Sequence, residues 1–144
     1  MAPPTGTGGS PAPIDRQILE YLRDRLETTA QVADATITDA ERHLALHVRL
    51  ADSYYPDDVK SAILLVRWYT NDDCKIHYRE VHHDHEWECR WDRHPSPHNT
   101  RDHFHPPPDA PTPGDDADWP ADYRQMLTVV LNEIEDRIAE IWST

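Results

Sequence analysis

Residues 75–91, KIHYREVHHDHEWECRW, decide the fold that the sequence predicts. Apolar and polar side chains alternate through the first half of this stretch, and Trp87, Cys89 and Trp91 form the apolar half of a second alternation. Such alternation is typical of half-buried strands. The polar turn at residues 83–85 is short enough to join the two strands as an antiparallel hairpin, with the two tryptophans and the cysteine facing the core.

Further strands and two helices are predicted around this hairpin. Residues 32–38, 44–50 and 63–69 have strand character, and the apolar run of the last segment is typical of a central strand covered on both faces. Helical spacing of apolar residues predicts one helix at residues 14–26 and a second that opens at Asp118, has Pro120 in its first turn and ends near Trp142. We therefore predict an α+β fold: an antiparallel β-meander of about five strands, with an N-terminal helix and a long C-terminal helix packed on the sheet.

The remaining segments set the domain organisation. Residues 1–13 are rich in proline and glycine and are predicted to be a disordered tail. Residues 14–144 then form a single domain that contains a histidine-rich motif at 75–108. Within that motif the proline-rich segment from residue 94 to 114 is predicted to be irregular.

The composition indicates where the protein works. The net charge is -13, and only two of the 14 basic residues are lysines. An acidic, lysine-poor surface is typical of adaptation to high salt, where the Debye length falls to roughly 3 Å at 1 M. This charge repels anionic membranes. The sequence also contains no run of about 18 apolar residues, which is the length needed to span a membrane. We expect a cytoplasmic protein whose two cysteines, Cys74 and Cys89, are free thiols.

Histidine clustering is the strongest functional signal, because eight of the ten histidines lie between His77 and His105. Imidazole titrates near neutral pH and suits proton transfer during RNA cleavage. Strand alternation places Lys75, His77 and Arg79 on one face of the hairpin, and His103 and His105 project together if their segment is extended. One patch could then supply a base, an acid and a phosphate clamp. The polar partners that can share this face are Glu88, Arg90 and Asp92.

Other interpretations of these residues remain open. His103 and His105 could bind zinc with His82, His83, His85 or Cys89, although no Cys-x-x-Cys or His-Glu-x-x-His pattern is present. The histidines of residues 82–85 could instead form a polar turn. Arg90 and Asp92 could form a structural ion pair, and Asp102 could orient His103 or cap a turn.

The segment Cys89-Arg90-Trp91-Asp92, a Pro/His loop and then Arg101-Asp102-His103-Phe104-His105 resembles the TumE-like toxin family. The resemblance covers residues 32–142, and the composition is that of a halophilic, archaeal-type variant. It implies the toxin of a type II toxin–antitoxin module that cleaves RNA and is inhibited by a cognate antitoxin protein. The residues it implies are Arg90, Asp92, Asp102, His103 and His105. Arg93 stands where the family has asparagine, the loop gains His94, Pro95, Pro97 and His98, and the helix at residues 14–26 is an addition.

Together these observations predict a metal-independent endoribonuclease that uses histidine acid–base catalysis, without a cofactor and away from membranes. The predicted catalytic residues are His103, His105, Asp102 and Asp92, and the predicted phosphate-binding residues are Arg90, Arg79 and His77. The alternatives are a zinc-binding domain and a non-catalytic interaction module that docks through its C-terminal helix or through residues 106–108.

Overall fold

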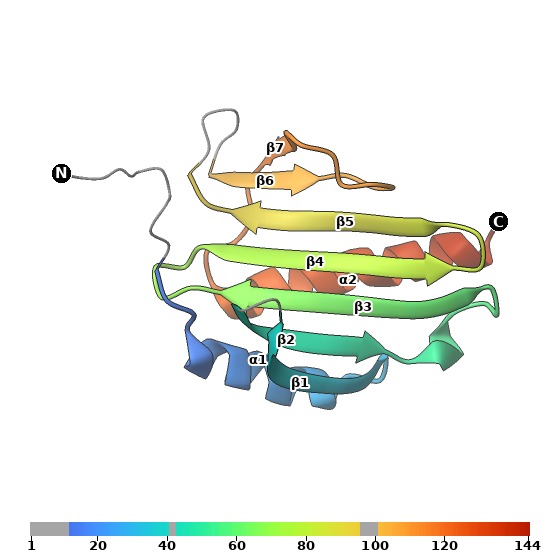
Figure 1. Ribbon diagram of the computed structural model, residues 1–144, viewed down its shortest axis with the longest axis horizontal. Helices are drawn as coiled ribbons and strands as arrows, with labels where there is room; N and C mark the ends of the chain where they lie inside the picture. Colours follow the sequence, from blue (N-terminus) through green and yellow to red (C-terminus); the bar gives the residue numbers. More distant parts are fainter. Residues whose placement is uncertain (1–11, 41–42, 96–100) are drawn as a thin grey trace.

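Seven strands form one antiparallel sheet in the order of the sequence, from β1 to β7 (Figure 1). The computed structural model of the protein describes residues 12–40, 43–95 and 101–144. Each strand pairs with the strand that follows it in the chain, so the sheet is a simple meander. The strands are β1 Val32–Ala40, β2 His43–Leu50, β3 Val59–Trp68, β4 Cys74–His82, β5 Glu86–Arg93, β6 Asp102–His105 and β7 Asp115–Ala117, and a short 3-10 helix, Asp52–Tyr54, precedes β3.

Two helices cover one face of this sheet, and within the described residues the other face carries no helix, so we call it the helix-free face. Figure 1 looks onto the helix-free face, with α2 behind the strands. Helix α1, Arg16–Glu27, is capped by the Asp15 carboxylate, and helix α2, Tyr123–Trp142, is capped by that of Asp122. The helices bury their apolar stripes against the sheet, through Leu19, Leu22 and Leu26 of α1 and Met126, Leu127, Val130, Ile134 and Ile138 of α2.

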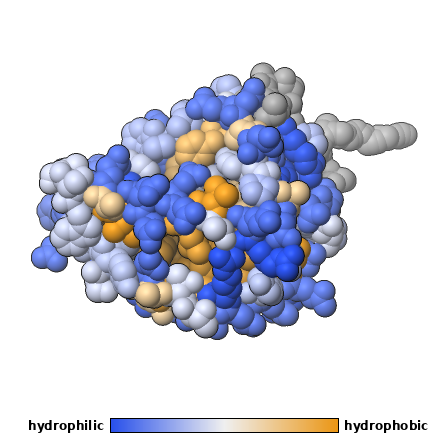
Figure 2. All heavy atoms as spheres, turned by 180° about the vertical axis from the view of Figure 1, so that it is seen from behind, coloured by the Kyte–Doolittle hydropathy of each residue, from blue (hydrophilic) through white to orange (hydrophobic). Residues whose placement is uncertain are grey.

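The helix-covered face carries the hydrophobic core. Every second residue of β4 and β5 points into the core. Tyr78 and Trp91 are two of these residues, and both are almost completely buried. Figure 2, which views this side, shows apolar side chains in the middle of the face, largely surrounded by hydrophilic ones. Residues of the other parity therefore project from the helix-free face, where no core constrains them to be apolar.

Register places the polar residues of β4, β5 and β6 in rows across the helix-free face. Lys75 pairs with Asp92, which pairs with His103 on its other side. In the next row Arg90 lies between His77 and His105. The hairpin predicted for residues 75–91 is confirmed, and its register brings together side chains that are far apart in the sequence.

Three sequence predictions require correction. The sheet has seven strands because β6 lies within the segment predicted to be irregular, residues 94–114, and β7 directly follows that segment. Strand β3 alternates between buried and half-buried residues, so it is covered on one face only. Helix α2 begins at Tyr123, so Asp118 and Pro120 precede it, and Asp122 is the residue that caps its exposed N–H groups.

Other predictions agree with the structure or fall outside it. The α+β class, the antiparallel sheet and both helices are confirmed. The predicted tail lies outside the described residues up to Pro11, while Pro13 accepts a hydrogen bond from the Thr70 N–H. Neither described helix is apolar over a sufficient length to cross a membrane.

Candidate functional site

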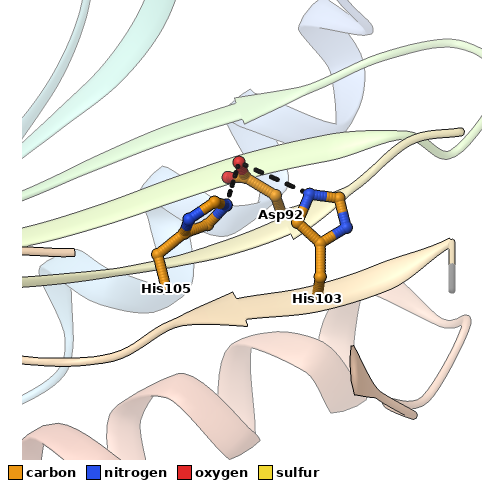
Figure 3. Close-up of side chains that lie close together, drawn as sticks. All are labelled: Asp92, His103 and His105. Atoms are coloured by element: carbon orange, nitrogen blue, oxygen red, sulfur yellow. Dashed lines mark ion pairs between the residues drawn. The ribbon is translucent and has the colours of Figure 1, made fainter. Parts of the chain in front are cut away.

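Three histidine side chains converge on the carboxylate of Asp92 on the helix-free face. The Asp92 Oδ2 atom lies 3.2 Å from Nε2 of His105, 3.8 Å from Nε2 of His94 and 4.0 Å from Nε2 of His103. Figure 3 shows the rings of His103 and His105 facing Asp92 from the neighbouring strand. We refer to Asp92, His94, His103 and His105 as the Asp92 cluster.

The rings of the cluster form a continuous series. His94 contacts His103 edge to face with ring centroids 4.7 Å apart, and His103 contacts His105 in the same manner at 5.2 Å. Arg90 closes the group on the β5 side, where its Nε donates to Asp92 Oδ2 at 3.0 Å. The cluster and Arg90 together therefore combine one carboxylate, three imidazoles and one guanidinium.

The interior of the cluster is shielded and its rim is open. Asp92 is 1% exposed, and His103 and His105 are each 3% exposed. The side chains of Arg90 and His94 are 32% and 37% exposed, so solvent reaches the cluster through these two residues.

The loop between β6 and β7 fixes the orientation of His105. The Nδ1 atom of His105 lies 2.8 Å from the carbonyl oxygen of Pro111, and since a carbonyl can only accept, Nδ1 carries the hydrogen. Gly114 permits this approach, because a Cβ at that position would lie 2.5 Å from the Phe104 carbonyl oxygen and 3.2 Å from His105 Nδ1. A locked Nδ1–H turns the Nε2 atom of His105 toward Asp92.

The cluster perturbs the protonation of two of its members. Burial would raise the pKa of the Asp92 carboxyl, but the neighbouring His94 and Arg90 outweigh burial and hold that pKa below its ordinary value. In turn, Asp92 raises the pKa of His94 above its ordinary value, although partial burial opposes the change. The resting cluster thus favours an ionised Asp92 and a protonated His94.

Two buried atoms of the cluster have no hydrogen-bond partner among the described residues. They are Oδ1 of Asp92 and Nε2 of His105, which lies near Asp92 but outside hydrogen-bond geometry. Buried polar atoms are nearly always paired, so these two atoms indicate that a further group could interact with the site.

The structure brings together only part of the predicted site. Asp92, Arg90, His103 and His105 meet, because residues 103–105 are extended in β6, which is the condition under which the two histidines were expected to project together. His77 lies in the row of Arg90, with its Nε2 2.6 Å from Glu88. Arg79 forms an exposed ion pair with Glu86, one row further from the cluster.

Asp102 does not join the cluster. It points to the helix side of β6, where its carboxylate accepts from Arg93 at 2.7 Å and from the Trp119 N–H at 2.8 Å. The pair is buried and ties β5 and β6 to the segment that leads into α2.

The residues considered as additional zinc ligands, His82, His83, His85 and Cys89, also lie outside the Asp92 cluster. Cys89 faces the helix side, and burial raises the pKa of its thiol to about 12, so it stays protonated. His82 hydrogen-bonds to Glu80 inside the core and stacks on His85. Both cysteines are free, as predicted, and the core-facing row is confirmed for Cys89 and Trp91, while Trp87 is half-buried.

Sequence reasoning did not assign His94 to the site. The signal was present, because His94 follows Asp92 by two positions and alternation therefore places both side chains on the same face. His94 lies one residue beyond the end of β5 at Arg93, so it was treated as part of the following loop. His98 lies outside the described residues.

The sequence is similar to that of a known protein family. The family model described as Toxin TumE matches residues 18–138, which is well over half of the chain. No curated protein and no solved structure matches the sequence.

Proposed function

The chain belongs to the TumE toxin family, and from this premise we propose that it is the toxin of a type II toxin–antitoxin module and cleaves RNA without a metal ion. The observation that supports the chemistry is the convergence of three imidazoles and Arg90 on Asp92. An antitoxin protein and RNA are then its partners. Both are cytoplasmic, which is where we propose that the toxin acts.

The chemistry follows from the two protonation states that cleavage needs. One imidazole accepts the proton of a ribose 2′-hydroxyl while the 2′-oxygen attacks the phosphorus atom. A second imidazole donates a proton to the 5′-oxygen that leaves. A neutral His105 suits the base role, because its locked Nδ1–H leaves Nε2 to accept a proton. The products are a 2′,3′-cyclic phosphate and a 5′-hydroxyl end.

His103 shares this acid–base work with His105 and connects it to solvent. Its ring lies between that of His94 at the rim and that of His105 in the interior. His94, whose pKa Asp92 raises, is protonated more readily than an ordinary histidine and suits the acid role.

Phosphate binding falls to the cationic groups around the rim. Arg90 contacts Asp92 and pairs with His105 in the sheet register, and Lys75 lies beside Asp92 in the adjacent strand. His77 and Arg79 extend the same face. Because the protein carries a net charge of -13, RNA binding must depend on this local set and on salt that screens the rest of the surface.

RNA cleavage by the purified chain in the presence of a chelator tests the proposal. We expect His103→Ala and His105→Ala each to lower the rate about 10²- to 10⁴-fold. His83→Ala is the matched control, because His83 is exposed in the β4–β5 turn and away from the cluster. A folded His103→Ala, His105→Ala double variant that cleaves RNA and arrests growth like the wild type would refute histidine catalysis.

The near-complete burial of Asp92, His103 and His105 favours a second candidate, a non-catalytic interaction module. In that case growth arrest would survive the double substitution and disappear only when a binding surface is changed. The same set of variants therefore separates the two candidates.

A further inference from the structure

We propose that Asp92, His103 and His105 form a binding site for a divalent transition-metal ion of the zinc class, with His94 as the fourth ligand. The site itself stands on geometry and does not depend on RNA cleavage. Its consequence for cleavage rests on the proposed function.

The first observation is the spacing of the donor atoms. One ligand atom from each of the three residues lies within 4.8 Å of the other two. The separations of 3.2 Å and 4.0 Å from Asp92 Oδ2 bracket the distance of about 3.4 Å between two ligands of a tetrahedral zinc ion. Small side-chain rotations would bring all three atoms to one ion.

The second observation is the direction of His105. Its Nδ1–H is held by the Pro111 carbonyl, which is the usual second interaction of a metal-binding histidine and presents Nε2 as the ligand. Nε2 lies 3.2 Å from Asp92 Oδ2 but makes no hydrogen bond to it. Two ligands of one ion both point at the ion and not at each other, so a shared cation explains this geometry better than a shared proton.

The third observation is the incomplete hydrogen bonding of the Asp92 carboxylate. Arg90 satisfies Oδ2, whereas Oδ1 is buried and has no hydrogen-bond partner within the described part of the chain. A buried, unsatisfied carboxylate oxygen is costly, and a cation beside it removes that cost. The shielded interior also admits an ion more readily than a large ligand.

The donor set determines which ions fit. Two imidazoles and a carboxylate suit zinc and its first-row neighbours, whereas magnesium and calcium prefer sites made of oxygen atoms. His94 lies 3.8 Å from Asp92 Oδ2 and reaches solvent, so it can complete the coordination and give the ion a path of entry.

Occupation of this site would act as a switch. An ion that engages Nε2 of His103 and His105 removes the lone pairs that acid–base catalysis requires. The metal-bound form is therefore the inactive form of the toxin, and a chelator restores cleavage.

Binding is tested on the full chain with zinc in competition with a chromophoric chelator, and with Co²⁺, whose visible absorption reports its ligands. We expect one ion per chain, and an affinity that falls by more than about 100-fold in Asp92→Asn and His105→Ala, since loss of an outer-shell partner alone costs about 10- to 100-fold. His83→Ala removes a histidine outside the cluster and should bind like the wild type.

Two results would overturn the site. One is equal zinc affinity in the wild type and in Asp92→Asn. The other, which does not depend on any variant folding, is the absence of a Co²⁺ absorption band and of a zinc-induced rise in the melting temperature of the wild type. If zinc binds but no RNA is cleaved under any condition, the site stands and the proposed function fails.

Discussion

Asp102 and His103 are adjacent in β6 and point to opposite faces of the sheet. Asp102 pairs with Arg93 on the helix side, while His103 joins Asp92 on the helix-free side. One short strand therefore carries two sets of polar groups with separate tasks. The Arg93–Asp102 pair holds the strand in place, and the Asp92 cluster is the site for which we propose the chemistry.

Removing the Arg93–Asp102 pair should destabilise the fold. The two side chains are 5% and 11% exposed, and breaking a buried pair by removing one partner costs about 3–5 kcal/mol. Urea unfolding of Arg93→Ala should show this loss in the free energy of unfolding. Arg49→Ala, which breaks an exposed pair with Asp34, is the control and should cost about 0–1 kcal/mol. Equal losses in the two variants would contradict the structural role of Arg93.

The same pair predicts a dependence of stability on pH. Burial would raise the pKa of Asp102, but hydrogen bonds from Arg93 and the Trp119 N–H outweigh it and hold that pKa below its ordinary value. Because the pKa of Asp102 is lower in the folded protein than in the unfolded chain, the ionised carboxylate contributes to the free energy of unfolding. This contribution is complete above the unfolded pKa of about 3.9, and it is lost as the pH falls through the folded pKa.

The wild type should therefore exceed Asp102→Asn in stability at pH 7, and the difference should shrink as the pH falls below about 4. Chemical unfolding of both proteins across this range measures the difference directly. A difference that stays constant with pH would show that the charge of Asp102 contributes nothing.

Gly114 should be intolerant of a side chain. A Cβ would lie 2.5 Å from the Phe104 carbonyl oxygen, so Gly114→Ala must push the loop away from β6 and weaken the bond between Pro111 and His105. We expect a loss of about 1–3 kcal/mol in stability, together with weaker zinc binding.

Ala110→Gly is the matched control in the same loop. Ala110 has a φ of 49°, a conformation that glycine adopts without strain, so this substitution should leave stability unchanged or raise it. Similar destabilisation by both substitutions would show that the loop does not depend on the close approach at Gly114.

Salt should stabilise the protein. A net charge of -13 repels itself, and screening strengthens as the Debye length falls from about 10 Å at 0.1 M to about 3 Å at 1 M. The melting temperature in KCl should rise steeply over this range and level off above it. A melting temperature that is independent of KCl would contradict the predicted salt adaptation.

Local pattern was sufficient to predict most of the fold. The alternation in residues 75–91 predicts β4 and β5, and helical spacing predicts α1 and most of α2. Strand β6 escaped prediction because three of its four residues, Asp102, His103 and His105, are polar, and its extended form depends on partners in β5 and β7.

The candidate site was predictable only in part, for a related reason. A motif can associate His103 and His105 with Asp92, but only the register between β5 and β6 decides which face each residue occupies. The family motif predicts that Asp102 belongs to the site, whereas its position in β6, opposite Arg93, places its side chain on the helix side. The locked tautomer of His105 depends on a backbone carbonyl in a loop, which no side-chain pattern reveals.

The order of the sheet has a consequence for synthesis on the ribosome. Because every strand pairs with its neighbour in the chain, the meander can assemble hairpin by hairpin as residues emerge, and the last strand ends at Ala117. The Asp92 cluster and the Pro111 carbonyl that orients His105 precede α2 in the chain, so they can come together before α2 leaves the ribosome. Until α2 is released, the nascent chain exposes the apolar face of its sheet, which is where a chaperone would bind a newly made toxin.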